Sequence, residues 1–203
     1  MAIEKDFFRQ VMGQFATGVT VVTTNNKGII SGLTVNAFCS VSLDPPLVLV
    51  CVDLNSNTLP IIREGGNFAV NILTKDQEYL SRCFATPSIE RYENFCHAEY
   101  ATAATGAPIL DGVLAFVDAR VVAEYPGGDH VIFLGQVEAI GTPGTIEFAQ
   151  SVAPAHSTIV MREEHGDEVL PLGYYRGQYR HIASTYKEDS LEDSTRQYEK
   201  VPD

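Results

Sequence analysis

The chain has 203 residues, of which 45% are hydrophobic and 20% are charged, and its formal net charge is −12 at pH 7. This composition is that of a globular protein long enough to bury one sizeable core. Phosphate backbones attract lysine and arginine patches, so an acidic chain of this kind is not expected to bind nucleic acid. No stretch approaches the roughly 18 apolar residues of a membrane helix, and we expect no membrane partner.

The N-terminal residues and the cysteines both bear on location. The segment MAIEKDFFRQ is charged from its start and has no apolar h-region, so we expect no secretory signal and a cytoplasmic protein. No two cysteines form a C-x-x-C arrangement, which leaves a zinc or thioredoxin-like site without support. We therefore expect buried, reduced thiols at all four positions, which are Cys39, Cys51, Cys83 and Cys96.

The first half of the chain predicts a helix followed by a hairpin. Apolar residues on helical spacing predict a one-faced helix over 4–16, and the β-branched residues of 19–24 predict a strand. The sequence NNKG at 25–28 is typical of a turn, because Asn and Gly tolerate positive φ. The next strand is predicted over 29–42, and after two prolines a buried strand is predicted over 47–52.

The second half predicts three more strands, two helices and a C-terminal segment. Helices are expected at 58–64 and 75–85, and 86–112 is expected to be a loop because it is rich in Pro and Gly. Strands are expected at 68–73, 113–126 and 130–141, and a short terminal segment at 172–184. Strands with a few short helices predict a mainly β protein, a closed or partly closed antiparallel barrel. We expect one domain over 1–186 and a charged tail over 187–203.

The predicted strand at 29–42 has an unusual composition, because small polar residues recur where bulk is expected. It contains Thr34, Asn36, Ser40 and Ser42. One interpretation is a surface against which a ligand lies, and the other is the solvent face of an edge strand.

Five stretches in this order resemble the flavin reductase family, whose members have an FMN-binding split barrel. They are FATGVTVVTT at 15–24, GLTVNAFCSVSLDPPLVLVCV at 32–52, FAVNIL at 68–73, GDHVIFLGQV at 128–137 and PLGYYRGQYR at 171–180. The resemblance extends over most of residues 7–184. It implies a Greek-key split β-barrel and a homodimer. It also implies a role as the reductase component of a two-component flavin-dependent monooxygenase.

The resemblance implies which residues hold the flavin. In the family, the segment matching Thr34, Val35, Asn36 and Ala37 lies along the flavin, whose flat ring requires small side chains and hydrogen-bonding groups. Ser40 and Val52 are expected to extend this surface. The loop that contains Asp53, Ser56, Asn57 and Thr58 is expected at the phosphate side, where hydroxyls and backbone N–H groups can hold an anion. The alternative is an Asx-rich turn that caps the following helix.

Three further positions are assigned by the resemblance. Phe84 and Ala85 begin a stretch that is similar to the family's F-A-x(n)-R-F, so Arg91 is a candidate for the flavin phosphate, with Arg82 second. His130 of the GDH sequence is expected beside the nicotinamide, and Tyr174 in the same pocket. The alternatives are a surface ion pair for Arg91, a turn histidine for His130 and interface packing for Tyr174.

The resemblance therefore implies an NAD(P)H-dependent flavin reductase, with FMN or FAD as flavin and NADH or NADPH as hydride donor. Hydride transfer between two stacked rings requires no acid–base pair, which agrees with the lack of an obvious catalytic pair in the sequence. Two other classes stay open: a flavin-binding electron carrier or sensor without NAD(P)H turnover, and a scaffold subunit that has lost its ligand.

Overall fold

A β-hairpin near the N-terminus begins the sheet. The computed structural model, which describes residues 3–149 and 169–182, pairs strands β2 (Thr20–Asn26) and β3 (Ile29–Val35) antiparallel across a tight turn. In this turn Lys27 and Gly28 have φ of 51° and 93°, and the Gly28 N–H donates to Asn25 Oδ1 at 2.8 Å. The predicted hairpin and its turn are therefore confirmed.

The prediction of one strand over 29–42 is wrong, because the strand is broken at Asn36 and Ala37. β3 pairs with β2, whereas β4 (Phe38–Leu43) pairs with β5 (Pro46–Asp53). The strand order in the sheet is β3-β2-β6-β9-β10-β5-β4, so the two halves of the predicted strand form its opposite edges. Local composition does not reveal the break, because both halves have β character and differ only in their partners.

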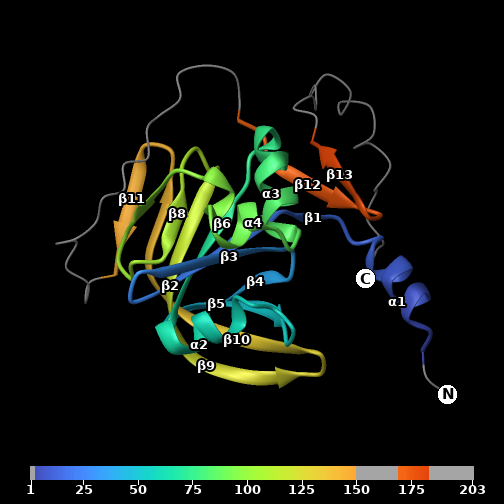
Figure 1. Cartoon of the computed structure of the whole chain (residues 1–203), viewed down its shortest axis with the longest axis horizontal. Coiled ribbons are helices and arrows are strands. Elements are labelled where there is room, and N and C mark those ends of the chain that lie inside the picture. Colours follow the sequence, from blue (N-terminus) through green and yellow to red (C-terminus); the bar gives the residue numbers. More distant parts are fainter. Residues whose placement is uncertain (1–2, 150–168, 183–203) are drawn as a thin grey trace, which may run out of the picture.

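The short connection between β3 and β4 requires the sheet to curl. Strands about 4.8 Å apart would put the first and last of seven flat strands roughly 29 Å from each other. Two linking residues cover only about 7 to 10 Å, so the edges must come together, as Figure 1 shows for β3 and β4. The mainly β split barrel is thus confirmed. The other strands of this sheet are β6 (Asn67–Ile72), β9 (Ala115–Gly127), β10 (His130–Thr142) and β11 (Thr145–Phe148), which pairs with β10.

The sheet has one apolar core inside the barrel and a second apolar layer on its outer face. Gly135 on β10 is needed inside, because a Cβ there would lie 2.5 Å from the Phe68 ring. The inner core includes Val22, Val50, Phe68, Val70 and Phe133, and the outer layer includes Leu73, Leu80, Phe84, Phe116 and Leu172. Burial of such side chains supplies the main favourable free energy of folding.

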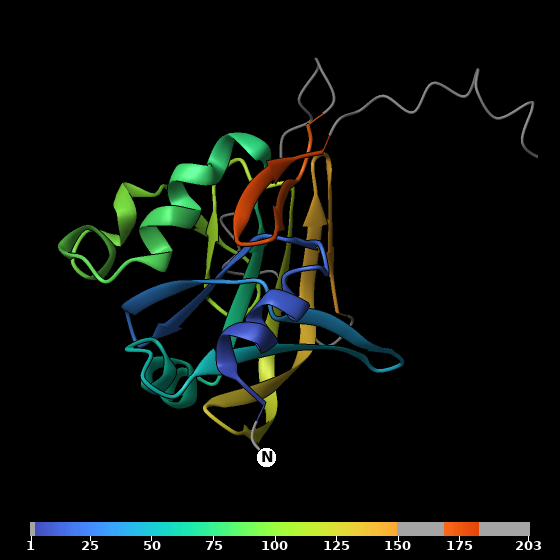
Figure 2. The ribbon, with the colours of Figure 1, turned by 90° about the vertical axis from the view of Figure 1, so that its right-hand side faces the viewer.

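The three predicted helices are present with altered bounds. They are α1 (Lys5–Met12), α2 (Leu59–Gly65) and α3 (Glu78–Ala85), which follows a 3₁₀ turn, η1 (Lys75–Gln77). Glu4 caps α1 by accepting from the N–H groups of Asp6 and Phe7. No residue of α1 is buried, and Figures 1 and 2 show this helix outside the barrel. Its apolar side chains, Phe7, Phe8, Val11 and Met12, are between 50% and 61% exposed.

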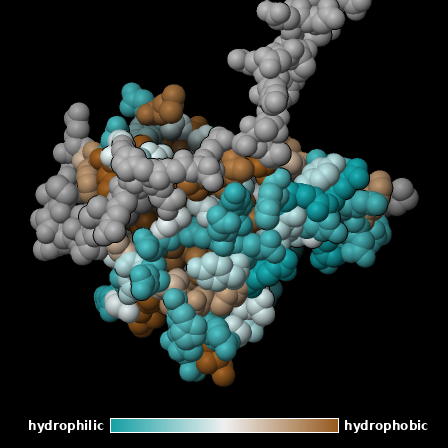
Figure 3. Space-filling model, turned by 90° about the horizontal axis from the view of Figure 1, so that it is seen from above, coloured by the Kyte–Doolittle hydropathy of each residue, from teal (hydrophilic) through white to brown (hydrophobic). Residues whose placement is uncertain are grey.

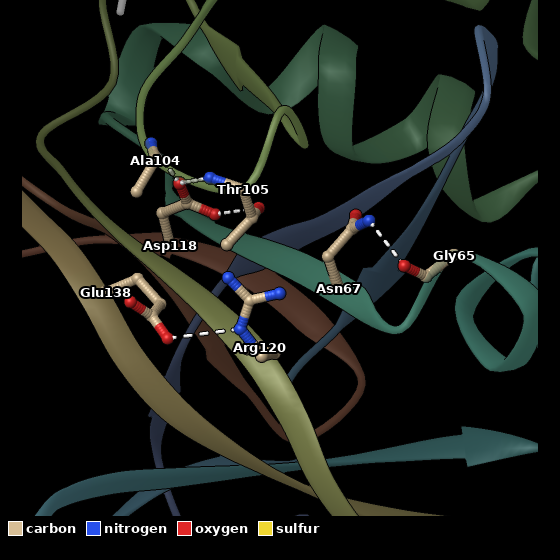
Figure 4. Close-up of polar contacts among 7 residues, drawn as sticks. All are labelled: Gly65, Asn67, Ala104, Thr105, Asp118, Arg120 and Glu138. Carbon is tan, nitrogen blue, oxygen red and sulfur yellow. Dashed lines mark hydrogen bonds and ion pairs between the residues drawn. The ribbon is translucent and has the colours of Figure 1, made fainter. Parts of the chain in front are cut away.

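The prediction of a loop over 86–112 is wrong, since this stretch contains four short elements. Contacts with residues distant in the sequence fix these four elements. Each element is too short to show a hydrophobic period in the sequence. Buried Asp118 on β9 accepts from the N–H groups of Ala104 and Thr105 at 2.7 and 2.8 Å and from the Thr105 hydroxyl (Figure 4). Burial raises the pKa of Asp118, and these hydrogen bonds oppose that shift. The elements are α4 (Ile89–Tyr92), η2 (Phe95–His97), β7 (Tyr100–Thr102) and β8 (Pro108–Leu110).

The prediction of four buried, reduced cysteines is also wrong. Cys83 of α3 and Cys96 of η2 form a disulfide, Cys39 is exposed, and Cys51 is half-buried. The pairing follows from the packing of η2 beside α3, a contact that sequence spacing does not show. Burial, with a smaller contribution from the neighbouring Cys39, raises the pKa of the Cys51 thiol.

The terminal segment predicted over 172–184 is a hairpin of β12 (Leu172–Tyr175) and β13 (Gln178–His181), and β12 pairs with β1 (Thr17–Gly18). The Arg176 N–H donates to Gly13 O at 2.9 Å, which ties this hairpin to the end of α1. The predicted tail over 187–203 and the domain boundary at 186 lie outside the described residues. Among the described residues, no helix has the length and apolar character needed to cross a membrane.

Candidate functional site

The open edge of β3 is the natural starting point, because its residues face α3 and α4 instead of another strand. Gly32, Thr34 and Asn36 alternate onto one side of the chain. At Gly32 a Cβ would lie 2.8 Å from the Phe84 ring, so glycine allows α3 to approach closely. The Thr34 hydroxyl donates to the carbonyl of Ser81 on α3 at 2.6 Å. Asn36 is exposed just beyond the end of β3.

A hollow of about 200 Å³ lies between β3, α3 and the C-terminal hairpin. Ser81 and Ala85 are four residues apart and so lie on one face of α3. Tyr174 and Tyr179 are cross-strand partners whose ring centroids are 5.5 Å apart, and the Tyr179 hydroxyl hydrogen-bonds to Ser81 Oγ at 2.8 Å. The hollow is lined by Val19, Thr34, Asn36, Ser81, Ala85, Tyr174 and Tyr179.

Four of these lining residues, Thr34, Asn36, Ala85 and Tyr174, are site residues predicted from the sequence, and three are not. Ser81 was missed because serine on a helix gives no distinctive signal. Tyr179 had a signal: Arg176 and Gly177 form the hairpin turn, and the residues on either side pair across it. A hairpin reading of YYRGQY would therefore have placed Tyr179 opposite Tyr174.

Arg91 of α4 is a buried cation near the hollow. It contacts β3 at Gly32, two residues before Thr34, which lines the hollow. It is only 8% exposed, its Nε–H donates to Gly32 O at 2.9 Å, and its Nη2 lies 3.5 Å from Thr58 Oγ1. Burial lowers the pKa of Arg91. No carboxylate of residues 3–149 or 169–182 forms an ion pair with it. A buried charge usually has an ionic partner, so this guanidinium suits an anionic ligand.

The surroundings of Arg91 supply further hydroxyl groups. Thr58 Oγ1 and Ser31 Oγ are hydrogen-bonded at 2.8 Å, and Thr58 is fully buried. The loop before Thr58 is also an Asx turn, since Asp53 Oδ1 accepts from the Asn55 N–H at 2.7 Å. The Thr58 N–H in turn donates to Ser56 Oγ at 3.3 Å. The Asx turn of the alternative interpretation is therefore present, but its capping of α2 is not, because Thr58, the N-cap residue of α2, makes no side-chain capping hydrogen bond. The turn does not exclude anion binding.

His130 begins β10, directly opposite Asp53 of β5 in the sheet. Its Nδ1 lies 2.8 Å from Asp129 Oδ1, and this contact lowers the pKa of Asp129. The Leu54 N–H donates to Asp129 O at 3.0 Å, so the β9–β10 turn contacts the loop that leads to Thr58. His130 therefore lies beside this loop and is not among the residues that line the hollow.

The remaining predicted residues differ in how far their side chains can reach a ligand. Val35 and Val52 lie in the inner core, and Phe84 lies in the outer layer against Phe95, so only their backbone groups could contact a ligand. Ala37, Ser40 and Asn57 are exposed. The structure thus arranges most of the predicted residues in three groups, at the hollow, around Arg91, and at His130 with Asp53.

These groups suit a flat ring joined to a phosphate, because the hollow offers two tyrosine rings and Arg91 offers a buried positive charge. Among the described residues, no three His, Cys, Asp or Glu side chains are grouped so that they could hold a metal ion.

The comparisons with known proteins agree with this geometry. The reductase subunit HsaB of a flavin-dependent monooxygenase from Mycobacterium tuberculosis is 33% identical over 180 residues, covering 89% of this chain and 83% of that protein. An NADH-dependent flavin reductase from a Rhodococcus species is 40% identical over 136 residues, covering 65% and 74%. The solved NADH:FAD oxidoreductase SgcE6 of Streptomyces globisporus, in complex with NAD and FAD fragments, has a TM-score of 0.68 and 30% identity, covering 90% of this chain and 95% of that one. A family model described as the flavin reductase like domain matches residues 12–183, so the chain belongs to the flavin reductase family.

Proposed function

We propose that this protein is an NAD(P)H-dependent flavin reductase. The observation that carries the proposal is the position of buried Arg91, which forms no ion pair with a carboxylate of the described residues. It contacts β3 at Gly32, two residues before Thr34, which lines the hollow together with Asn36 and the two tyrosines. A bound flavin would supply a two-electron acceptor, taking a hydride from nicotinamide C4 at its N5. The protein then has to bind the flavin and nicotinamide rings face to face and to exclude other relative orientations of the two rings.

The residues divide this work by their chemistry. Arg91, Thr58 and the loop from Asp53 are proposed to hold the flavin phosphate through charge and N–H or O–H donors. Asn36 and Ala37, exposed at the break between β3 and β4, are proposed to lie along the ring, where a small side chain permits contact. We assign Thr34 a positioning role, because its hydroxyl donates to Ser81 O.

His130 is proposed to orient the carboxamide or ribose of the dinucleotide. The Asp129 contact fixes one ring nitrogen, Nδ1, and leaves the other, Nε2, for a ligand. A role in binding is consistent with hydride transfer, which needs no proton donor at that position. An assay with each pair of flavin and dinucleotide distinguishes FMN from FAD and NADH from NADPH.

The reduced flavin is proposed to leave for a separate flavin-dependent monooxygenase. Support comes from relatives such as HsaB, which is named as a reductase subunit of such an enzyme. A cytoplasmic location is part of this proposal, since reduced nicotinamide dinucleotides are supplied there. The Cys83–Cys96 disulfide is unusual for that compartment.

We further propose a homodimer, because no element within residues 3–149 and 169–182 covers two apolar surfaces. One is the exposed face of α1. The other is the outward face of β5 and β10, where Leu49 pairs with Leu134 and Cys51 with Ile132. By contrast, on the part of the face in Figure 3 that is not drawn grey, hydrophobic residues are interspersed with hydrophilic ones. Sedimentation showing only monomer at micromolar concentration would contradict the homodimer.

The activity itself is tested by absorbance at 340 nm, with purified protein, NADH or NADPH, and FMN or FAD in each combination. We expect oxidation of the dinucleotide that saturates with added flavin, and the fastest pair identifies both preferences. Flavin binding without oxidation for any pair would favour a flavin-binding carrier or sensor instead.

The role of Arg91 is tested with Arg91→Met, which removes the charge and keeps most of the side-chain length. A lost charge-assisted hydrogen bond of about 1.5 to 3 kcal/mol corresponds to a rise of roughly 10- to 100-fold in the KM for FMN. We expect little change in kcat. Riboflavin lacks the phosphate, so its KM should change little.

Arg63→Met serves as the matched control, because Arg63 is exposed and pairs with Glu124 on the surface. An equal rise in the KM for FMN and riboflavin would mean that Arg91 serves only to cap the carbonyl of Gly32 at the open edge of β3. Thermal unfolding of both variants checks that the loss of a buried side chain has not unfolded the protein.

His130→Ala tests the dinucleotide site. The loss of one hydrogen bond of about 1 kcal/mol should raise the KM for the dinucleotide roughly fivefold, with a smaller effect on kcat and none on the KM for flavin. Steady-state kinetics measure all three. His181→Ala, at an exposed position of β13, is the control. A KM like that of the wild type would remove His130 from this role.

A further inference from the structure

Ser81 joins three parts of the chain at the wall of the hollow. Its side chain is fully buried on α3, its carbonyl accepts from the Thr34 hydroxyl of β3 at 2.6 Å, and its hydroxyl hydrogen-bonds to the Tyr179 hydroxyl of β13 at 2.8 Å. Ser81 and Tyr179 are 98 residues apart in sequence. This partly buried hydroxyl pair forms only while both partners stay in place, so it links the position of β13 to that of α3.

The Tyr179 ring is held from three directions. Its hydroxyl is fixed by Ser81, the ring of Tyr174 lies against it edge-on at 69°, and the Arg82 guanidinium is 4.7 Å from its centroid. Arg82 is itself held by Glu78 at 2.6 Å. A ring with so few remaining orientations loses little entropy when a second ring is placed against it.

We propose that the planar ring of one reactant, the flavin or the nicotinamide, lies against the aromatic ring of Tyr179, which forms a wall of the hollow. Ser81 sets the orientation of this wall. The inference rests on the proposed flavin reductase function and adds two residues to its site. The non-aromatic lining side chains, Val19, Thr34, Asn36, Ser81 and Ala85, are small or short and leave room for a flat ligand. Aromatic rings pair favourably when offset or edge-on, which suits either isoalloxazine or nicotinamide.

The competing role for Tyr179 is that of an anchor that only attaches the C-terminal hairpin to α3. An anchor and a wall differ in what they do to a bound ring. Loss of an anchor weakens every ligand together with the fold, whereas loss of a wall weakens one ring ligand and changes the spectroscopy of that ring. Tyrosine beside a flavin quenches its fluorescence, so the emission of bound flavin reports contact directly.

The test uses Tyr179→Leu, which removes the ring, and Tyr179→Phe and Ser81→Ala, which remove only the hydrogen bond. Flavin is titrated into each full-length variant without dinucleotide, its fluorescence is recorded, and both KM values are then measured. Tyr79→Leu and Tyr79→Phe are the controls, because Tyr79 lies on the same helix, is 65% exposed and does not line the hollow.

We expect Tyr179→Leu to weaken one ring ligand by about threefold to tenfold, with the Tyr79 variants like the wild type. If the ring is the flavin, its dissociation constant rises and bound flavin is less quenched. If the ring is the nicotinamide, the KM for the dinucleotide rises alone. The effects of Tyr179→Phe and Ser81→Ala should be smaller and non-additive in the double variant, because both break one hydrogen bond.

An unchanged affinity for both ligands in Tyr179→Leu would overturn the proposal, as would an equal loss for both together with a lower melting temperature. Failure of the proposed function looks different, because the wild type itself would then neither bind flavin nor oxidise the dinucleotide.

Discussion

The closure of the sheet by the two residues Asn36 and Ala37 is the constraint on which the rest of the site depends. A sheet whose first and last strands are consecutive in the chain must curl until its edges meet. The edges meet without full pairing, and β3 keeps an open side that α3 and α4 approach. The segment at this break is exposed, although the strands on either side of it contribute to the barrel core.

The open side of β3 also explains why a charge can be buried there. Among the described strands only β2 pairs with β3, so the carbonyl of Gly32 has no strand partner on the open side, and Arg91 donates to it. A backbone carbonyl satisfies one N–H of a guanidinium but does not neutralise its charge. Burial of a charge without a counter-ion costs free energy, and a bound anionic ligand would offset that cost. The hydrogen bond from Arg91 to Gly32 thus stabilises the edge of β3, but it leaves the positive charge of Arg91 without a neutralising carboxylate among the described residues.

The elements that the sequence predicts well are those with strong local signals. The NNKG turn, the strands at 47–52 and 68–73, and the long pair β9 and β10 are where residue patterns place them. The elements between Ala85 and Asp111 could not be predicted, because partners distant in sequence, such as Asp118, decide their backbone. The candidate site divides in the same way: motif residues such as Thr34 and Arg91 are predictable. Ser81 and the Cys83–Cys96 pair depend on which helix packs against which strand.

The turn that follows α4 has a consequence of its own. Phe95, Cys96 and His97 all have φ near 50°, a left-handed conformation that costs non-glycine residues about 1–2 kcal/mol each. The disulfide to Cys83 closes the intervening segment, including Arg91, into a covalent ring. A ring of this size has far fewer conformations than an open loop, so the arginine is ordered before any ligand arrives. Reduction of the disulfide would open this ring, and the packing of α4 and η2 against α3 and β3 would then hold the segment without the cross-link. The redox state of the Cys83–Cys96 disulfide therefore affects the conformational entropy that is lost when a ligand binds at Arg91.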